Sequence, residues 1–303
     1  MRVFVTGATG FIGSAVVSEL LSSGHQVLGL ARSDQAAASL KAAGAEVLRG
    51  DMNDLDSVRS GAAAADGVIH TAYNHDFTVS RMDAAREDQR AITAMAEALA
   101  GSNRPLVITS GTGTRAAGRI ATEDTTPASD PTGRYATEEA ALAFVERGVR
   151  IVLVRFPPTV HGRGDHGFVP ILINVARTAG VSAYPGGGSN RWSAVHRLDA
   201  AHLFRLAVES APAGTRLHGV GEEGIPVREI AQAIGRHLNV PVRSISPEEA
   251  RTHFGFLGGF FSLDAPASSD LTQKLLGWHP VQPGLIADLD EGHYFAPAVA
   301  MAS

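Results

Sequence analysis

Three glycines near the start of the chain have a spacing that could bind the pyrophosphate of a dinucleotide. Gly7, Gly10 and Gly13 lie in the stretch TGATGFIG, between the β-rich segment Arg2 to Thr6 and a helical pattern. Glycine lets such a turn bend tightly and approach the phosphates, and the helix N-terminus offers free N–H groups and a positive dipole end. A glycine triplet alone is a weak signal, but this strand-to-helix context is what the motif requires.

The next expected strand, QVLGLA, indicates which dinucleotide would bind. An acidic residue at its end would bind the ribose hydroxyls of NAD. Here Ala31 stands at that position, and Arg32 and Ser33 follow. A guanidinium can form a bidentate, charge-assisted pair with a 2′-phosphate. The sequence therefore favours NADP over NAD; the alternative leaves Arg32 in solvent and gives the ribose to Asp34.

Strands and helices alternate around these motifs. The segments RVFVT, QVLGLA, EVLR, GVIHT, PLVITS and RIVLVR are short apolar runs, typical of parallel strands buried on both faces. Helices are expected between them, at residues 11–23, 35–43, 82–100 and 132–147. This pattern predicts an α/β fold with a doubly wound parallel Rossmann sheet and right-handed crossovers.

The rhythm becomes irregular after about Arg155, where Gly and Pro cluster. We expect a Rossmann domain at residues 1–160 and a smaller substrate-binding lobe at 161–303, with room for the chain to cross between them. Further helices are expected at residues 199–210, 227–237 and 268–276.

Composition narrows the class of protein. The 303 residues are 44% hydrophobic and 19% charged, as in ordinary globular domains. The absence of cysteine excludes disulfides and thiol catalysis. The net charge of -5 comes without long charge runs, which argues against a nucleic-acid surface. Neither a membrane span nor a signal peptide is evident, so we expect a cytoplasmic protein with a small-molecule substrate.

Several motifs together resemble one family. TGATGFIG, GDMND, VIHTA, VITSGT and RFPPTVHG occur in the order seen in extended short-chain dehydrogenases/reductases. The chain looks like an atypical NAD(P)-dependent epimerase/dehydratase-like member, over nearly its whole length and most specifically in the first 160 residues. The resemblance implies a Rossmann domain, a C-terminal substrate lobe and chemistry by hydride transfer. Because family members often form dimers, it also implies a homodimer in which the helix at 82–100 packs against its partner.

The resemblance, with the glycine and arginine signals, assigns a set of cofactor-binding residues. Asp51 would hold the adenine amino group, although it could instead cap the helix that begins near Asp54. Pro157 and Pro158 would shape the nicotinamide pocket, because proline fixes φ and presents an apolar face. The expected cofactor-binding residues are Gly7, Thr9, Gly10, Phe11, Ile12, Gly13, Arg32, Ser33, Asp51, Met52, Thr71, Ala72 and Pro157.

The resemblance also implies a catalytic group, with one departure from the family pattern. Tyr135 falls at the position of the proton-transferring tyrosine. Ser110 or Thr112 would supply the hydroxyl that holds the substrate oxygen; we assign Thr112 to the substrate and Ser110 to the cofactor side. Glu139 occupies the position of the family's lysine, four residues after the tyrosine.

A carboxylate at position 139 changes the expected chemistry. It can accept hydrogen bonds from ribose hydroxyls, but it disfavours loss of the phenol proton of Tyr135. We therefore expect a proton donor and a site that favours reduction. The chain has only two lysines, Lys41 and Lys274, and neither lies near Tyr135 in sequence. The alternative is that Tyr135 is an ordinary structural residue.

Three residues near the start of the second lobe are candidates for substrate binding. His161 replaces a tyrosine of the family's pattern, and His166 and Phe168 follow on the same loop. A histidine there could donate a proton near neutral pH, but a structural role is the more common outcome for each of the two. His and Asp also occur together in HGRGDH and VHRLDAAH, but the spacing fits a metal site poorly, and we expect no metal.

The favoured function is NADPH-dependent reduction of a small or medium carbonyl compound. One alternative is a nucleotide-sugar epimerase or dehydratase, which would need a stronger tyrosine base. The other is a non-catalytic NADP-binding sensor, which the missing lysine would permit.

Overall fold

The computed structural model describes residues 1–75, 79–113, 118–126 and 133–296. Its first lobe is built on a seven-stranded parallel sheet with strand order β10-β6-β5-β4-β1-β2-β3. The order reverses beside β1, which confirms the predicted doubly wound Rossmann sheet. The strands are β1 (Arg2–Thr6), β2 (Gln26–Ala31), β3 (Glu46–Arg49), β4 (Gly67–His70), β5 (Pro105–Gly111), β6 (Arg150–Phe156) and β10 (Thr215–His218).

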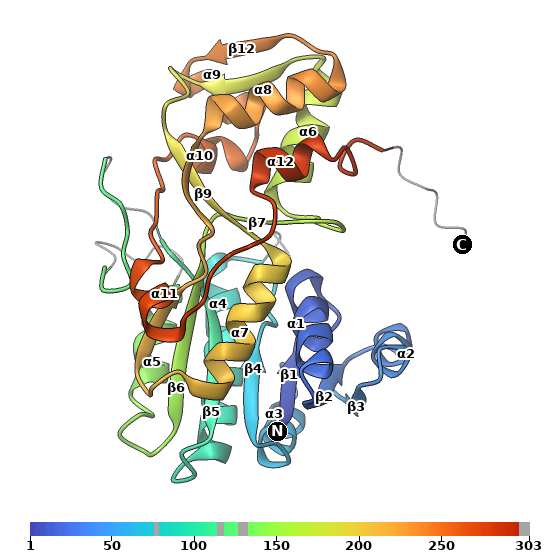
Figure 1. Ribbon diagram of the computed structural model, residues 1–303, viewed down its shortest axis with the longest axis vertical. Coiled ribbons are helices and arrows are strands. Elements are labelled where there is room, and N and C mark those ends of the chain that lie inside the picture. Colours follow the sequence, from blue (N-terminus) through green and yellow to red (C-terminus); the bar gives the residue numbers. More distant parts are fainter. Residues whose placement is uncertain (76–78, 114–117, 127–132, 297–303) are drawn as a thin grey trace.

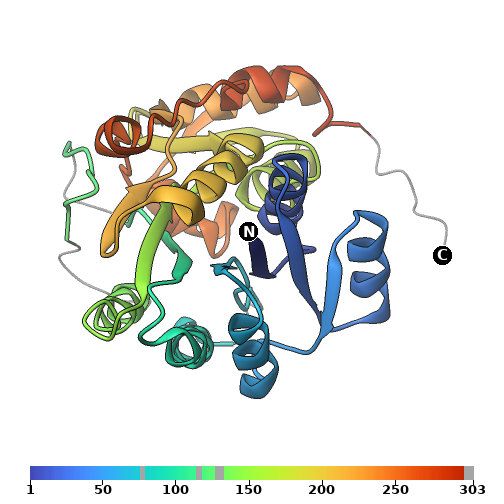
Figure 2. The ribbon, with the colours of Figure 1, turned by 60° about the horizontal axis from the view of Figure 1, so that its bottom comes forward.

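Helices cover both faces of this sheet (Figure 2). Successive residues of a strand point to opposite faces, so Val3 and Val5 of β1 join one core cluster and Phe4 joins the other. One face packs against α1 (Phe11–Ser22), α2 (Asp34–Ala42) and α7 (Arg197–Ser210). The other face packs against α3 (Leu55–Ala63), α4 (Arg81–Leu99) and α5 (Arg134–Leu142).

The second lobe lies over one end of the strands (Figure 1). Its core gathers the aromatic side chains of Trp192, Phe254 and Phe261. Its strands are β7 (Thr159–His161), β8 (Ser182–Pro185), β9 (Arg191–His196), β11 (Glu222–Pro226) and β12 (Val242–Ile245). Its helices are α6 (Phe168–Ala179), α8 (Val227–Leu238), α9 (Pro247–His253), α10 (Leu257–Phe261) and α12 (Leu285–Asp290).

The chain crosses between the lobes more than once. After β9 it returns to the first sheet as α7 and β10, and α11 (Asp270–Leu276) contacts both of these elements. Residue 160 therefore marks only the first crossing.

Several helices differ from the prediction. Helix α5 ends at Leu142 and is followed by turns, whereas the sequence predicted a helix over 132–147. Helices α6, α9, α10 and α12 were not predicted. In α6, Pro170 lies in the first helical turn, where its missing N–H would have no intrahelical partner anyway. Among the described residues, no helix combines the length and apolar character needed to cross a membrane.

Candidate functional site

The glycine loop between β1 and α1 has the geometry of a phosphate cradle. Gly7 has a φ of +65°, and a Cβ there would lie 2.6 Å from the backbone nitrogen of Ala72. A Cβ on Gly13 would lie 2.0 Å from the carbonyl oxygen of Gly7. Gly10 is the N-cap of α1 and provides no side-chain cap, so the first N–H groups of the helix remain available to an anion.

The other predicted residues of this loop are arranged around the same turn. Thr9 is exposed, and Phe11 and Ile12 are half-buried at the start of α1. Thr71 and Ala72 lie against Gly7, and the Thr71 hydroxyl donates to the carbonyl oxygen of Thr6. The residues present thus fit the pyrophosphate of a dinucleotide.

Two arginines lie where the adenosine ribose is expected. Ala31 is buried at the end of β2, and Arg32 is exposed, with no partner among the described residues. Arg49 of β3 pairs in register with Ala31, and it forms an ion pair with Asp34 at 2.9 Å and donates to the carbonyl oxygen of Ser33. The Ser33 hydroxyl caps α2 by accepting from the N–H of Ala36.

The segment after β3 folds into a local turn. Asp51 Oδ1 accepts from the N–H of Asn53 at 2.8 Å, and Met52 packs against the core. The N-cap of α3 is Asp54 and not Asp51, so capping does not account for Asp51.

Two polar contacts hold the helix that carries Tyr135. Tyr135 is half-buried at the second position of α5. One residue before it, Arg134 Nη1 donates to the carbonyl oxygen of Thr109 on β5 at 3.1 Å. Three residues after it, Glu138 accepts from Arg155 of β6. These contacts fix the start of α5 at the ends of β5 and β6.

The candidate hydroxyl residues lie at the end of β5, the strand to which α5 is fixed. Ser110 and Thr112 are 7% and 3% exposed. Ser110 is the register partner of Arg155, and the N–H of Thr112 donates to the carbonyl oxygen of Phe156. Pro157 is buried immediately after β6. Pro131 and Thr132, which precede α5, lie outside the described residues.

Glu139 is placed differently from Glu138. Its carboxylate is about half exposed and forms an ion pair with Arg216 of β10 at 2.8 Å. That cation balances the charge of Glu139, so the electrostatic argument for a tyrosine that only donates protons becomes weaker. The sequence places Glu139 at the position of the family's lysine; in the structure its carboxylate pairs with Arg216 at the surface.

A buried ionic network lies beneath α5 and was not predicted. Arg155 and Glu138 are 2% and 3% exposed, with Arg155 Nε 3.0 Å from Glu138 Oε1. Arg155 Nη1 also donates to the carbonyl oxygens of Glu123 and Thr125. Glu123 in turn accepts from both the N–H and the hydroxyl of Thr272 at 2.7 Å. The network joins the tyrosine helix to β6 and to α11.

A second buried pair, also not predicted, lies at the end of β4. His70 Nε2 is 2.9 Å from Asp88 Oδ1, and His70 Nδ1 is 2.7 Å from the Thr6 hydroxyl. Asp88 also lies 4.0 Å from Arg134, whose guanidinium stacks 3.7 Å from the ring centroid of Tyr73. The motif VIHTA contains His70, but its partner lies on a helix 18 residues away, and no local pattern identifies it.

The three predicted substrate residues have different surroundings. His161 is fully buried, and its Nδ1 lies 2.8 Å from Asp288 Oδ2. Burial opposes ionisation of Asp288, but hydrogen bonds from His161 and His293 lower its pKa. Phe168 packs against Trp192 inside the second lobe. Of the three, only His166 is exposed. Its ring lies edge-on to that of Phe11, the first residue of α1, with 5.8 Å between the ring centroids.

The His and Asp residues of VHRLDAAH each contact a different partner. His196 caps α7, Asp199 accepts from the N–H groups of Val281 and Gln282, and His202 pairs with Glu19. These contacts give each residue a structural role.

Comparison with known proteins identifies the family. The family model "NAD dependent epimerase/dehydratase family" matches residues 3–218. The chain therefore belongs to the NAD-dependent epimerase/dehydratase family. An uncharacterized protein of Schizosaccharomyces pombe is 52% identical over 296 residues, covering 97% of this chain and 100% of that protein. An uncharacterized protein of Saccharomyces cerevisiae is 50% identical over 292 residues, covering 95% and 98%.

More distant matches include named enzymes. A 4-hydroxy-2-methyl-3-oxo-4-farnesyl-3,4-dihydroquinoline-1-oxide ketoreductase of Stigmatella aurantiaca is 28% identical, covering 71% of this chain and 66% of that enzyme. Among solved structures, gox2253 matches with a TM-score of 0.79 at 22% identity, covering 97% of both chains. The UDP-glucose 4-epimerase of Thermus thermophilus in complex with NAD matches with a TM-score of 0.75 at 22% identity, covering 98% and 99%. These structures share the fold.

Proposed function

We propose that this protein is an NADPH-dependent reductase of a small or medium carbonyl compound. The observation that carries the proposal is the attachment of α5 to the ends of β5 and β6, through Arg134 and Glu138. This attachment sets the start of α5, which carries the half-buried Tyr135, at the carboxyl ends of β5 and β6, where Ser110 and Thr112 also lie. The ketoreductase of Stigmatella aurantiaca supports reduction as the direction of the chemistry.

When bound, the dinucleotide would supply a hydride to the carbonyl carbon. Tyr135 donates its phenol proton to the carbonyl oxygen, which completes the alcohol, and water then restores the proton. A hydroxyl of Ser110 or Thr112 donates a hydrogen bond to the same oxygen and orients it. Arg134 and Glu138 act on Tyr135 only by positioning its helix.

The preference for NADPH rests on the end of β2. Arg32 is exposed and has no carboxylate partner among the described residues, so its guanidinium is available to a 2′-phosphate. The neighbouring cation, Arg49, is partly neutralised by Asp34. Ala31 offers no carboxylate to the ribose of NAD.

The direct test is NADPH consumption with a panel of aldehydes and ketones. Tyr135→Phe should lower the turnover rate about 100-fold or more, which is the usual scale of general acid catalysis. Tyr184→Phe, a change in β8 of the second lobe, is the matched control and should leave the rate unchanged. Equal rates for wild type and Tyr135→Phe would remove Tyr135 from the mechanism. Binding of NADPH without turnover of any compound would favour a sensor.

A further inference from the structure

Arg197 lies at an unusual place for a cation, beside the N-terminus of α1. Its guanidinium carbon is 4.8 Å from the ring centroid of Phe11, the first residue of that helix. Its Nη2 donates to the hydroxyl of Ser14, one turn further on, at 3.2 Å. The positive end of a helix dipole disfavours a cation at this position.

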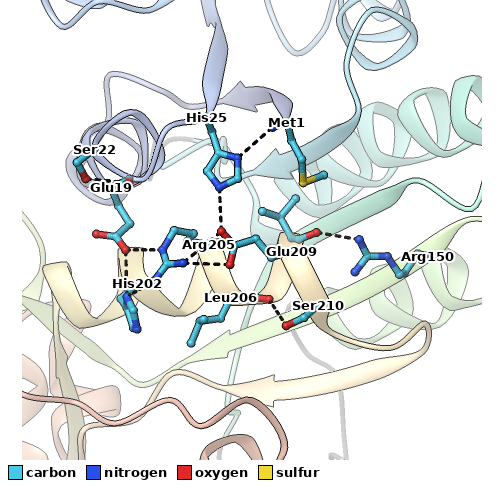
Figure 3. Close-up of polar contacts among 11 residues, drawn as sticks. Met1, Glu19, Ser22, His25, Arg150, His202, Arg205, Leu206, Glu209 and Ser210 are labelled. Carbon is cyan, nitrogen blue, oxygen red and sulfur yellow. Dashed lines mark hydrogen bonds and ion pairs between the residues drawn. The ribbon is translucent and has the colours of Figure 1, made fainter.

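Helix α7, which begins with Arg197, runs parallel to α1 and is fixed to it. Contacts follow in the same order along both helices, from Arg197 with Phe11 to Arg205 with Glu19. Figure 3 shows Arg205 between Glu19 of α1 and Glu209 of its own helix, with His202 alongside. The N-termini of α1 and α7 therefore lie together, and both contribute a positive dipole end.

The loop at residues 162–167 packs against the Arg197 side chain. The carbonyl oxygen of Arg163 accepts from Arg197 Nη1 at 2.9 Å. Gly162 and Gly164 have φ values of +134° and +87°. A Cβ on Gly162 would lie 2.9 Å from Arg197 Cγ, and a Cβ on Gly164 would lie 3.6 Å from Nη1. The loop thus holds the guanidinium against the start of α1.

This loop is itself held in shape by the C-terminal segment. The Tyr294 hydroxyl accepts from the N–H of Gly162 and donates to Asp165 Oδ2, both at 3.0 Å. Asp165 also accepts from the N–H of Gly167. Asp165, the carboxylate of this loop, is therefore already engaged.

The guanidinium lacks a counter-ion within the described part of the chain. No carboxylate there lies within ion-pair distance of Arg197, and its Nε is buried without a hydrogen-bond partner. Asp199 of the same helix accepts from Val281 and Gln282 instead. Burial lowers the pKa of Arg197, as expected for a charge that is removed from water without compensation.

We infer that Arg197 binds the pyrophosphate of the dinucleotide beside the glycine loop. The glycine loop offers backbone N–H groups, and the first residue of α7 adds a guanidinium beside them. An anion here would satisfy Arg197 and the uncapped N-terminus of α1 together. The inference rests on the dinucleotide cofactor that underlies the proposed function, but not on the proposed reduction.

The test is equilibrium binding, measured without any substrate. Arg197→Met should weaken the binding of NADPH, NADH and ADP-ribose by a similar factor of about 10 to 100, because all three carry the pyrophosphate. Arg197→Lys keeps the charge without the planar fork, and should lose less. Arg243→Met, at an exposed arginine of β12, is the matched control and should bind as wild type does.

Thermal unfolding of each variant, together with circular dichroism, shows whether it folds. If folded Arg197→Met binds ADP-ribose within twofold of wild type, the inference is overturned. It is also overturned if only NADPH, and not NADH or ADP-ribose, loses affinity, since the contact would then be to another part of the cofactor. If Arg197→Met does not fold, Arg197→Lys decides: an unchanged affinity for ADP-ribose would contradict a bidentate guanidinium contact. Because the assay measures binding alone, it tests the inference even if the protein binds the cofactor and reduces no compound.

Discussion

Arg155 and Arg197 are both removed from solvent to some extent, but among the described residues only Arg155 has a carboxylate partner. Arg155 is almost fully buried and its guanidinium meets Glu138 through two nitrogens. Arg197 is partly buried, stacks on Phe11, and has no carboxylate partner among the described residues. The first arrangement is complete as it stands, and the second needs an anion to balance its charge.

The difference separates a structural role from a ligand-binding role. A buried charge with a well-formed counter-ion mainly fixes the geometry of its surroundings; here that geometry is the seat of the tyrosine helix. A cation held by neutral groups at a helix N-terminus is compensated only when an anion binds. The same distinction applies at the adenosine end, where Arg49 is paired with Asp34 and Arg32 is exposed.

The largest effect should follow from breaking the Arg155 pair. Arg155→Met would leave Glu138 buried without its partner, and we expect a loss of about 3–5 kcal/mol in the free energy of unfolding. Urea denaturation measures this. The double variant Arg155→Met/Glu138→Leu should recover much of the loss, because it removes the uncompensated charge. A loss below about 1 kcal/mol for the single variant would show that the pair is not a structural anchor.

A smaller effect is expected at Arg32. Arg32→Glu should weaken NADPH binding about tenfold or more, because it replaces an attractive charge by a repulsive one beside the 2′-phosphate. Binding of NADH should change little. Arg49→Gln is the matched variant and should have less effect, since Arg49 already pairs with Asp34. A protein whose wild-type form prefers NADH would contradict this account of the adenosine end.

Arg197→Met should hardly affect stability, in contrast to Arg155→Met. Removing an uncompensated cation from a helix N-terminus offsets the lost stacking and hydrogen bonds, so we expect the free energy of unfolding to change by less than about 1 kcal/mol. The same urea experiment, without cofactor, measures it. A destabilisation as large as that of Arg155→Met would mean that both arginines serve the fold.

The smallest effect is expected at Glu139. Its partner Arg216 lies at the surface, and exposed ion pairs contribute about 0–1 kcal/mol. Glu139→Gln should therefore leave both stability and the turnover rate nearly unchanged. A large fall in cofactor affinity would instead show that the carboxylate leaves Arg216 and binds the ribose.

Local patterns were enough to predict the Rossmann sheet and the glycine loop. Each strand is a short apolar run, and Gly7, Gly10 and Gly13 act within one turn. The charged contacts could not be predicted in this way. Arg155 and Glu138 are 17 residues apart, His161 and Asp288 are 127 apart, and Arg197 and Ser14 are 183 apart. Only the folded chain brings them together, so their pairing leaves no periodic signal in the sequence.

The most direct test of the proposed function follows the hydride itself. Wild-type protein would be incubated with NADPH deuterated at C4 and with the panel of aldehydes and ketones, and the products analysed by mass spectrometry. The account predicts an alcohol with deuterium on the carbinol carbon, formed about 100-fold or more slowly by Tyr135→Phe. Binding of the deuterated cofactor without transfer of deuterium to any compound would contradict it.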